Sequence, residues 1–138
     1  MDYKTKQEEF WTGDFAKDYI DRNKSDELLA ANINLFTNAL SKCNQINSCI
    51  ELGSNIGMNL KALQKILPST ELSAVEINKS AIDELRKIVD KNNIYNESIL
   101  DWTNKKKYDM VFTKGVLIHI NPDYLKDVYE KIYNSSKN

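Results

Sequence analysis

A short glycine turn beside an acidic residue is the first feature of this sequence suited to binding a ligand. Segment 51–57 reads Glu-Leu-Gly-Ser-Asn-Ile-Gly and follows the apolar run 48–52. Gly53 allows a tight turn and a close approach of the backbone to a ligand, and Gly57 allows the following helix to pack near the strand. The candidate binding residues of this turn are Glu51, Gly53, Ser54, Asn55 and Gly57.

The charge beside the turn indicates the kind of ligand. A carboxylate at Glu51 repels a pyrophosphate and suits an ammonium or a sulfonium group. The dinucleotide pattern G-x-G-x-x-G is not met, because Asn55 takes the place of the middle glycine. No Gly-Lys-Ser/Thr follows the turn, which excludes a P-loop. The turn therefore favours S-adenosylmethionine, a cationic nucleoside, over a dinucleotide.

A second acid, Glu76, lies 19 residues after Gly57, at the end of the next predicted strand and beside Ile77. An acid at about this distance from a glycine turn can accept hydrogen bonds from both hydroxyls of a ribose. The alternative is a solvated carboxylate at the end of a strand. The spacing of Glu76 from the glycine turn favours the ribose-binding role over this alternative.

Apolar spacing and capping residues predict the elements that position these groups. Strands alternate with helices, which predicts an α/β fold with a mostly parallel sheet covered on both faces. We expect one domain over residues 1–138, with a helical arm at 1–23 and the core at 24–138. The predicted elements are a helical arm at 5–23 broken at Gly13, a helix at 26–42 capped by Ser25, a strand at 48–52, a helix from Gly57 to Pro68, a strand at 72–77, a helix capped by Asn78 or Ser80, a weaker strand at 94–100, a strand at 108–113, and a last helix capped by Asn121.

Composition excludes several other classes of protein. The chain has 138 residues, 41% hydrophobic and 28% charged, with a net charge of -1 and interspersed signs, so no nucleic-acid partner is expected. No apolar run approaches the ~18 residues of a membrane span, and we expect a cytoplasmic protein with no membrane partner. Cys43 and Cys49 match no zinc pattern, and the single histidine, His119, excludes a histidine-rich metal site.

With these residues, the chain resembles the class I S-adenosylmethionine-dependent methyltransferases. More narrowly, it resembles the pseudaminic acid biosynthesis-associated methylases, through Phe-Trp-Thr-Gly-Asp-Phe at 10–15, Tyr-Ile-Asp-Arg-Asn at 19–23 and Lys-Gly-Val-Leu-Ile-His-Ile-Asn-Pro at 114–122. The resemblance covers nearly the whole chain. It implies a Rossmann-like fold with sheet order 3-2-1-4, S-adenosylmethionine as cofactor with S-adenosylhomocysteine as product, and a small-molecule acceptor such as a sugar or nucleotide-sugar intermediate.

The resemblance also implies roles for individual residues. The Gly53 turn would hold the methionine part of the cofactor, and Glu76 would hold the ribose. Ser98 stands where many relatives carry an aspartate that contacts the adenine. The other implied cofactor contacts are Ile99 and Asp101 near the adenine, Lys114 and Gly115 near the sulfonium, and Trp11, Tyr19 and Arg22 on an arm folded over the cofactor, with His119 as a candidate catalytic base.

Four of these residues have a simpler structural interpretation that stays open. Trp11 and Tyr19 could only anchor the arm to the core, because large aromatic side chains are usually well buried. Arg22 could be a surface charge. His119 lies in an apolar run, where a single histidine is usually a packed or capping residue.

The predicted strands are fewer than in the family. Class I methyltransferases have seven strands, whereas we count four here and expect the last three to be lacking, with the region that helps to shape the acceptor pocket. An unpaired fourth strand is an aggregation risk, so we expect its edge to be covered by a second copy, by a partner or by the last helix. Three functions remain: an active small-molecule methyltransferase, a catalytically inactive module that binds S-adenosylmethionine or S-adenosylhomocysteine, and a structural domain with an empty site.

Overall fold

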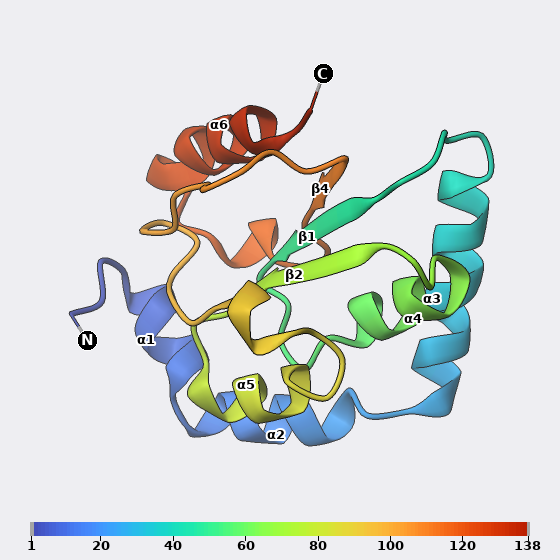
Figure 1. Ribbon diagram of the computed structural model, residues 1–138. Helices are drawn as coiled ribbons and strands as arrows, with labels where there is room; N and C mark the ends of the chain where they lie inside the picture. The colour runs from blue at the N-terminus through green and yellow to red at the C-terminus, as the bar shows by residue number, and fades with distance from the viewer. Residues whose placement is uncertain (1, 138) are drawn as a thin grey trace.

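Four parallel strands form the centre of the computed structural model, which describes residues 2–137 (Figure 1). Their order is β3-β2-β1-β4, which confirms the predicted topology. β1 is central, because Ile50 pairs with Ser73 of β2 on one side and with Val111 of β4 on the other. The strands are β1 (Ser48–Leu52), β2 (Glu71–Val75), β3 (Ile94–Tyr95) and β4 (Met110–Phe112).

The helices begin where the sequence supplies a cap. The hydroxyl of Thr5 accepts from the backbone N–H of Glu8, whose carboxylate accepts from that of Thr5, which is a capping box. The hydroxyl of Ser25 accepts from the backbone N–H of Leu28 and caps the third helix, and Gly13 separates the first two. The helices are α1 (Lys6–Thr12), α2 (Asp14–Arg22), α3 (Asp26–Leu40), α4 (Met58–Ile66), α5 (Lys79–Leu85) and α6 (Leu125–Ser135), with short 3₁₀ turns at Lys91–Asn93, Leu117–His119 and Pro122–Tyr124.

Helices cover both faces of the sheet, so β1 is buried along its whole length. On one face Cys49 packs with side chains of α3, α4 and α5. On the other face Ile50 and Leu52 pack with Trp102, Tyr108 and the α6 residue Val128. This alternation follows from the two-residue period of a strand. In Figure 1, α6 lies on one side of the sheet and α3, α4 and α5 lie on the other.

Three strands are shorter than predicted, and of the strand expected at 108–113 only Met110–Phe112 forms β4. The strand expected at 94–100 contains only Ile94–Tyr95, because the chain then turns at Ser98, whose carbonyl oxygen accepts from the backbone N–H groups of Asp101 and Trp102. β2 ends at Val75, so Glu76 lies just beyond the strand. The differences in β2 and β3 move polar side chains from the sheet to the loops that follow it.

The segment after α6 covers the start of the outer edge of β4. The backbone N–H of Tyr108 donates to Ser135, and that of Lys137 donates to Tyr108, both at 2.8 Å. Tyr108 and Ser136 thereby form a parallel bridge. Within residues 2–137, β4 itself pairs with no strand other than β1. We expected a second copy, a partner or the last helix to cover the edge of the fourth strand. In the structure, the residues at and directly after the end of the last helix bond to the start of this edge.

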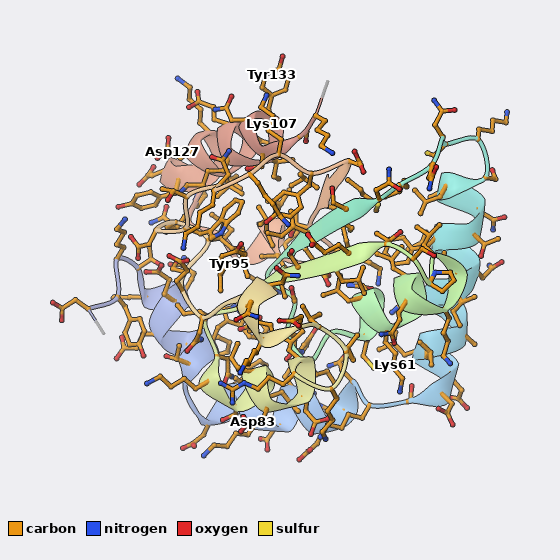
Figure 2. All side chains as sticks on the ribbon, viewed as in Figure 1. Lys61, Asp83, Tyr95, Lys107, Asp127 and Tyr133 are labelled. Atoms are coloured by element: carbon orange, nitrogen blue, oxygen red, sulfur yellow. The ribbon has the colours of Figure 1, made fainter. Side chains whose placement is uncertain are left out.

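Charged side chains surround the fold. Lys61 of α4, Asp83 of α5 and Asp127 of α6 are exposed, and Figure 2 labels them. Tyr95 is partly buried against the core on the α6 face. None of the helices in the described part of the chain is both long and apolar enough to cross a membrane.

Gly57 is a position where a side chain is expected to destabilise the fold. Its φ is +80°, and an added Cβ would lie 2.8 Å from a methyl carbon of the fully buried Leu85. We expect Gly57→Ala to lower the free energy of unfolding by about 1–3 kcal/mol in urea titrations. Gly13 is the matched control, since its φ is -87° and its Cβ would meet nothing closer than 3.6 Å. Equal losses for the two alanine variants would contradict the prediction.

Candidate functional site

A cavity of about 250 Å³ lies beyond the carboxyl ends of the strands. Its walls come from the loops after all four strands, together with the arm and α3. Strand order reverses at β1, because β2 and β3 follow on one side and β4 lies on the other. Ligands of open α/β sheets bind at such a switch point. The cavity is therefore the candidate site.

The glycine turn after β1 forms the cavity wall next to β2. The backbone N–H groups of Gly53 and Ser54 donate to Val75 at 2.9 and 3.1 Å, which fixes the turn to β2. Gly53 has φ +79°, and an added Cβ would lie 2.7 Å from Val116. Asn55 has φ +48°. The turn therefore depends on glycine for both its conformation and its close packing.

Glu76 is held rigidly at the cavity wall. Its Oε2 accepts from the backbone N–H of Asn55 at 2.6 Å, and its Oε1 accepts from that of Asn78 at 2.7 Å. Burial raises the pKa of Glu76, and these backbone donors oppose the rise. A carboxylate has about four acceptor positions, so Glu76 keeps positions for hydroxyl groups of a ligand.

Glu51 lies beneath the cavity instead of lining it. It is fully buried, and its Oε1 accepts from the side-chain amide of Asn59, which does line the cavity, at 2.6 Å. Its Oε2 has no hydrogen-bond partner among the described residues. Burial raises the pKa of Glu51 to about 8. The hydrogen bond from Asn59 opposes this rise, and the negative charge of Glu76 adds to it. Glu51 is therefore linked to the cavity through Asn59, and its negative charge acts there only when the carboxyl is ionised.

The end of the cavity near β4 is polar. Lys114 and Gly115 line it, and the Lys114 ammonium donates to the side-chain oxygen of Asn32 at 3.1 Å. Asn32 is buried on α3. The positive charge of Lys114 lowers the pKa of Glu51. A cation and an amide thus stand at the end of the cavity opposite β3.

The arm forms one wall of the cavity. Trp11 and Tyr19 line it with ring centroids 5.2 Å apart, and Trp11 meets the ring of His119 edge-on at 4.8 Å. The side-chain amide of Asn78 donates to the backbone carbonyl of Trp11 at 3.1 Å. Trp11 therefore contacts the rest of the site, and both aromatic residues line the cavity.

Two other expected contacts lie on the exposed surface. Arg22 is exposed, donates to the carbonyl oxygen of Asp18 on its own helix at 3.3 Å and faces the ring of Phe15. Asp101 is also exposed and pairs with Lys4. Neither residue lines the cavity, because each is held by a partner on the surface.

The structure brings most of the other predicted residues together. Gly57 lies below the turn, against Leu85, and does not line the cavity. The predicted residues that do line it are Trp11, Tyr19, Gly53, Ser54, Asn55, Glu76, Ile77, Ser98, Ile99, Lys114, Gly115 and His119. Polar lining residues that the sequence did not indicate are Thr5, Gln7, Glu8, Asn23, Asn32, Asn59, Asn78 and Asn121. For Glu8 the only signal was Thr-x-x-Glu at 5–8, which indicates a helix cap and no ligand.

Residues 50–138 match the family described as "Methyltransferase domain". Comparison with curated proteins finds no match. Solved structures show the same fold. The plantazolicin methyltransferase BpumL in complex with S-adenosylhomocysteine has a TM-score of 0.71 at 19% identity, covering 96% of this chain and 53% of that one.

Two further solved structures have the same fold. A sugar N-methyltransferase from a Streptoalloteichus species has a TM-score of 0.70 at 13% identity, over 91% of this chain and 50% of that one. A protein from Methanococcus maripaludis, assigned as an S-adenosyl-L-methionine-dependent methyltransferase, has a TM-score of 0.71 at 20% identity. The match covers 100% of this chain and 63% of that one. The chain thus spans about half to two thirds of the length of these structures.

Proposed function

Because this chain belongs to the methyltransferase domain family, we propose that it binds S-adenosylmethionine and transfers its methyl group to a small-molecule acceptor. The observation that carries the proposal is Glu76, a buried carboxylate fixed by two backbone N–H groups at the cavity wall. It stands beside the glycine turn of β1. A preorganised acceptor in this place suits the two hydroxyls of a ribose.

The charges around the cavity fit a cationic nucleoside. Glu51 and Glu76 are both buried, and the second oxygen of Glu51 has no partner among residues 2–137. Two acids in a low-dielectric site disfavour each other's ionised form. A sulfonium or ammonium group nearby would relieve this repulsion, whereas a pyrophosphate would increase it. The residues present therefore suit S-adenosylmethionine.

Each wall of the cavity would hold a different part of the cofactor. The backbone of 53–55 would hold the methionine part, and Glu76 would hold the ribose. Ser98 and Ile99 would border the adenine, and Lys114 and Gly115 would lie towards the sulfonium. When bound, the cofactor supplies an electrophilic methyl group, so the protein contributes alignment and exclusion of water. Trp11 and Tyr19 of the arm, which line the cavity, would help to exclude water.

His119 would accept the proton that an acceptor hydroxyl or amine loses on methylation. It lines the cavity, and its ring is positioned by Trp11. A second hollow, which these two rings line together with Phe10, Ile118 and Pro122, would admit the acceptor. The resemblance to the pseudaminic acid-associated methylases and the likeness to a sugar N-methyltransferase support a sugar or nucleotide-sugar acceptor.

Calorimetric titration with S-adenosylmethionine and S-adenosylhomocysteine tests the proposal. We expect micromolar dissociation constants for both nucleosides, and transfer of label from methyl-labelled cofactor to nucleotide-sugar acceptors. Absence of binding by either nucleoside would contradict the function. Binding of both without turnover on any acceptor would instead indicate an inactive cofactor-binding module.

A further inference from the structure

We propose that Glu8, on the N-terminal arm, recognises the adenine 6-amino group and so selects the base of the nucleoside. This inference rests on the proposed function and adds to it a residue that determines specificity. Glu8 is buried, with 9% of its surface exposed, and lines the cavity. Its Oε1 accepts from the hydroxyl of Ser98, which lies 90 residues further along the chain. The arm therefore places a carboxylate within the site.

The order of the strands indicates which end of the cavity holds the base. Glu76 follows β2, so it lies between the loop after β3, which carries Ser98, and the loop after β4, which carries Lys114. A nucleoside whose ribose is held by Glu76 directs its base towards one of these two loops. The β3 side provides the apolar side chains of Ile77 and Ile99 and, among the described residues, no lining cation, whereas the β4 side adds the ammonium group of Lys114 to Val116 and Ile120. A purine whose amino group is a hydrogen-bond donor belongs on the side without the cation, which is the side of Glu8.

Glu8 keeps an acceptor position there. Its Oε2 accepts from the backbone N–H groups of Lys4 at 2.6 Å and Thr5 at 3.0 Å, and its Oε1 accepts from Ser98 alone. Of about four acceptor positions on a carboxylate, three are used. The position that remains is on Oε1.

Ser98 is already occupied by neighbours. Its hydroxyl proton goes to Glu8, and its oxygen accepts from the backbone N–H of Leu100 at 3.1 Å. The negatively charged acceptor at this end of the cavity is therefore Glu8. The arm thus supplies the carboxylate that the loop after β3 lacks.

The chemistry of the purine edge makes this arrangement selective. Adenine presents an amino donor at position 6, whereas a 6-oxo purine presents an acceptor oxygen there. An amino group beside a buried carboxylate forms a charge-assisted hydrogen bond. An oxo group at the same place meets a like partial charge and leaves the carboxylate without its partner, which is costly in a buried site.

Paired calorimetric titrations with S-adenosylhomocysteine and its 6-oxo analogue, S-inosylhomocysteine, test the inference. We expect the native protein to bind the adenine nucleoside about 10- to 100-fold more tightly. Glu8→Gln keeps the capping box, since a glutamine there can also accept from the N-cap backbone, but its amide presents N–H donors at the position of Oε1. The variant should lose the preference for adenine or reverse it. Glu9→Gln, an exposed neighbour on the same helix, should keep it.

A second variant separates base recognition from a purely structural role of Glu8. Ser98→Ala removes the Glu8–Ser98 hydrogen bond but leaves the carboxylate, so the preference for adenine should remain even if both affinities fall. A Glu8→Gln variant that weakens both nucleosides equally and keeps the native ratio would overturn the inference while leaving the proposed function intact. A native protein that binds neither nucleoside would overturn both.

Discussion

Glu76→Gln is expected to lower the affinity for S-adenosylhomocysteine by about 100-fold or more. The carboxylate would accept from two ribose hydroxyls, and each hydrogen bond to a charged group contributes about 1.5–3 kcal/mol. Glutamine offers a single acceptor oxygen, and its amide N–H groups would face the backbone N–H of Asn55 or Asn78, both of which now donate to the carboxylate. Both the ligand and the loop therefore lose partners.

Calorimetry on the native and variant proteins measures this loss, and circular dichroism shows whether the variant is folded. Glu71→Gln is the matched control, because Glu71 is exposed at the opposite end of the same strand. The 2′-deoxy analogue of S-adenosylhomocysteine identifies the contact. Removal of that hydroxyl should weaken binding to the native protein much more than binding to Glu76→Gln. A folded Glu76→Gln variant with native affinity would show that the ribose lies elsewhere.

The sequence predicted the topology of this fold because its signals are local. Strand β1 is a continuous apolar run that ends at a glycine, and Ser25 caps α3 as predicted. Asn121 caps the 3₁₀ turn that leads into α6, not α6 itself. The strand expected at 94–100 was wrong beyond Tyr95. The bonds that end it, from Asp101 and Trp102 to the carbonyl oxygen of Ser98, form a turn with no glycine or proline to mark it.

The site was predictable only in the parts that depend on spacing along the chain. The turn at Gly53 and the acid Glu76 lie at the ends of adjacent strands, so their separation in sequence determines their proximity in space. Glu8 and Asn32 come from helices, and only the tertiary packing brings them to the cavity. The exposed position of Arg22 could not be predicted either, because it depends on which face of α2 packs on the core: Ala16 and Ile20 are the residues buried there.

The stability of the fold should depend on Glu51 in a pH-dependent way. The folded state raises the pKa of this carboxyl from 4.5 to about 8, so the folded state holds a proton that the unfolded state releases between these values. The free energy of unfolding therefore falls as pH rises through this range. At about pH 8 we expect Glu51→Gln to be more stable than the native protein by about 2–4 kcal/mol, with no such difference below about pH 4.5. Urea titrations at several pH values measure the difference in free energy of unfolding between the two proteins. A difference that does not change with pH would contradict the prediction.

Glu51→Gln should also change the affinity for the substrate, S-adenosylmethionine, more than the affinity for the product, S-adenosylhomocysteine. S-adenosylmethionine carries a positive sulfonium where S-adenosylhomocysteine carries a neutral thioether, and the field of an ionised Glu51 attracts only the former. Since this carboxyl is mostly protonated below about pH 8, affinity for S-adenosylmethionine should rise with pH up to that value and then level off. Glu51→Gln should remove this rise and lower the affinity for S-adenosylmethionine relative to S-adenosylhomocysteine by about tenfold above pH ~8. Asn59 would still donate to a glutamine oxygen, so the change would come from the lost charge. A ratio of the two affinities that is the same in both proteins at every pH would show that Glu51 does not act on the sulfonium.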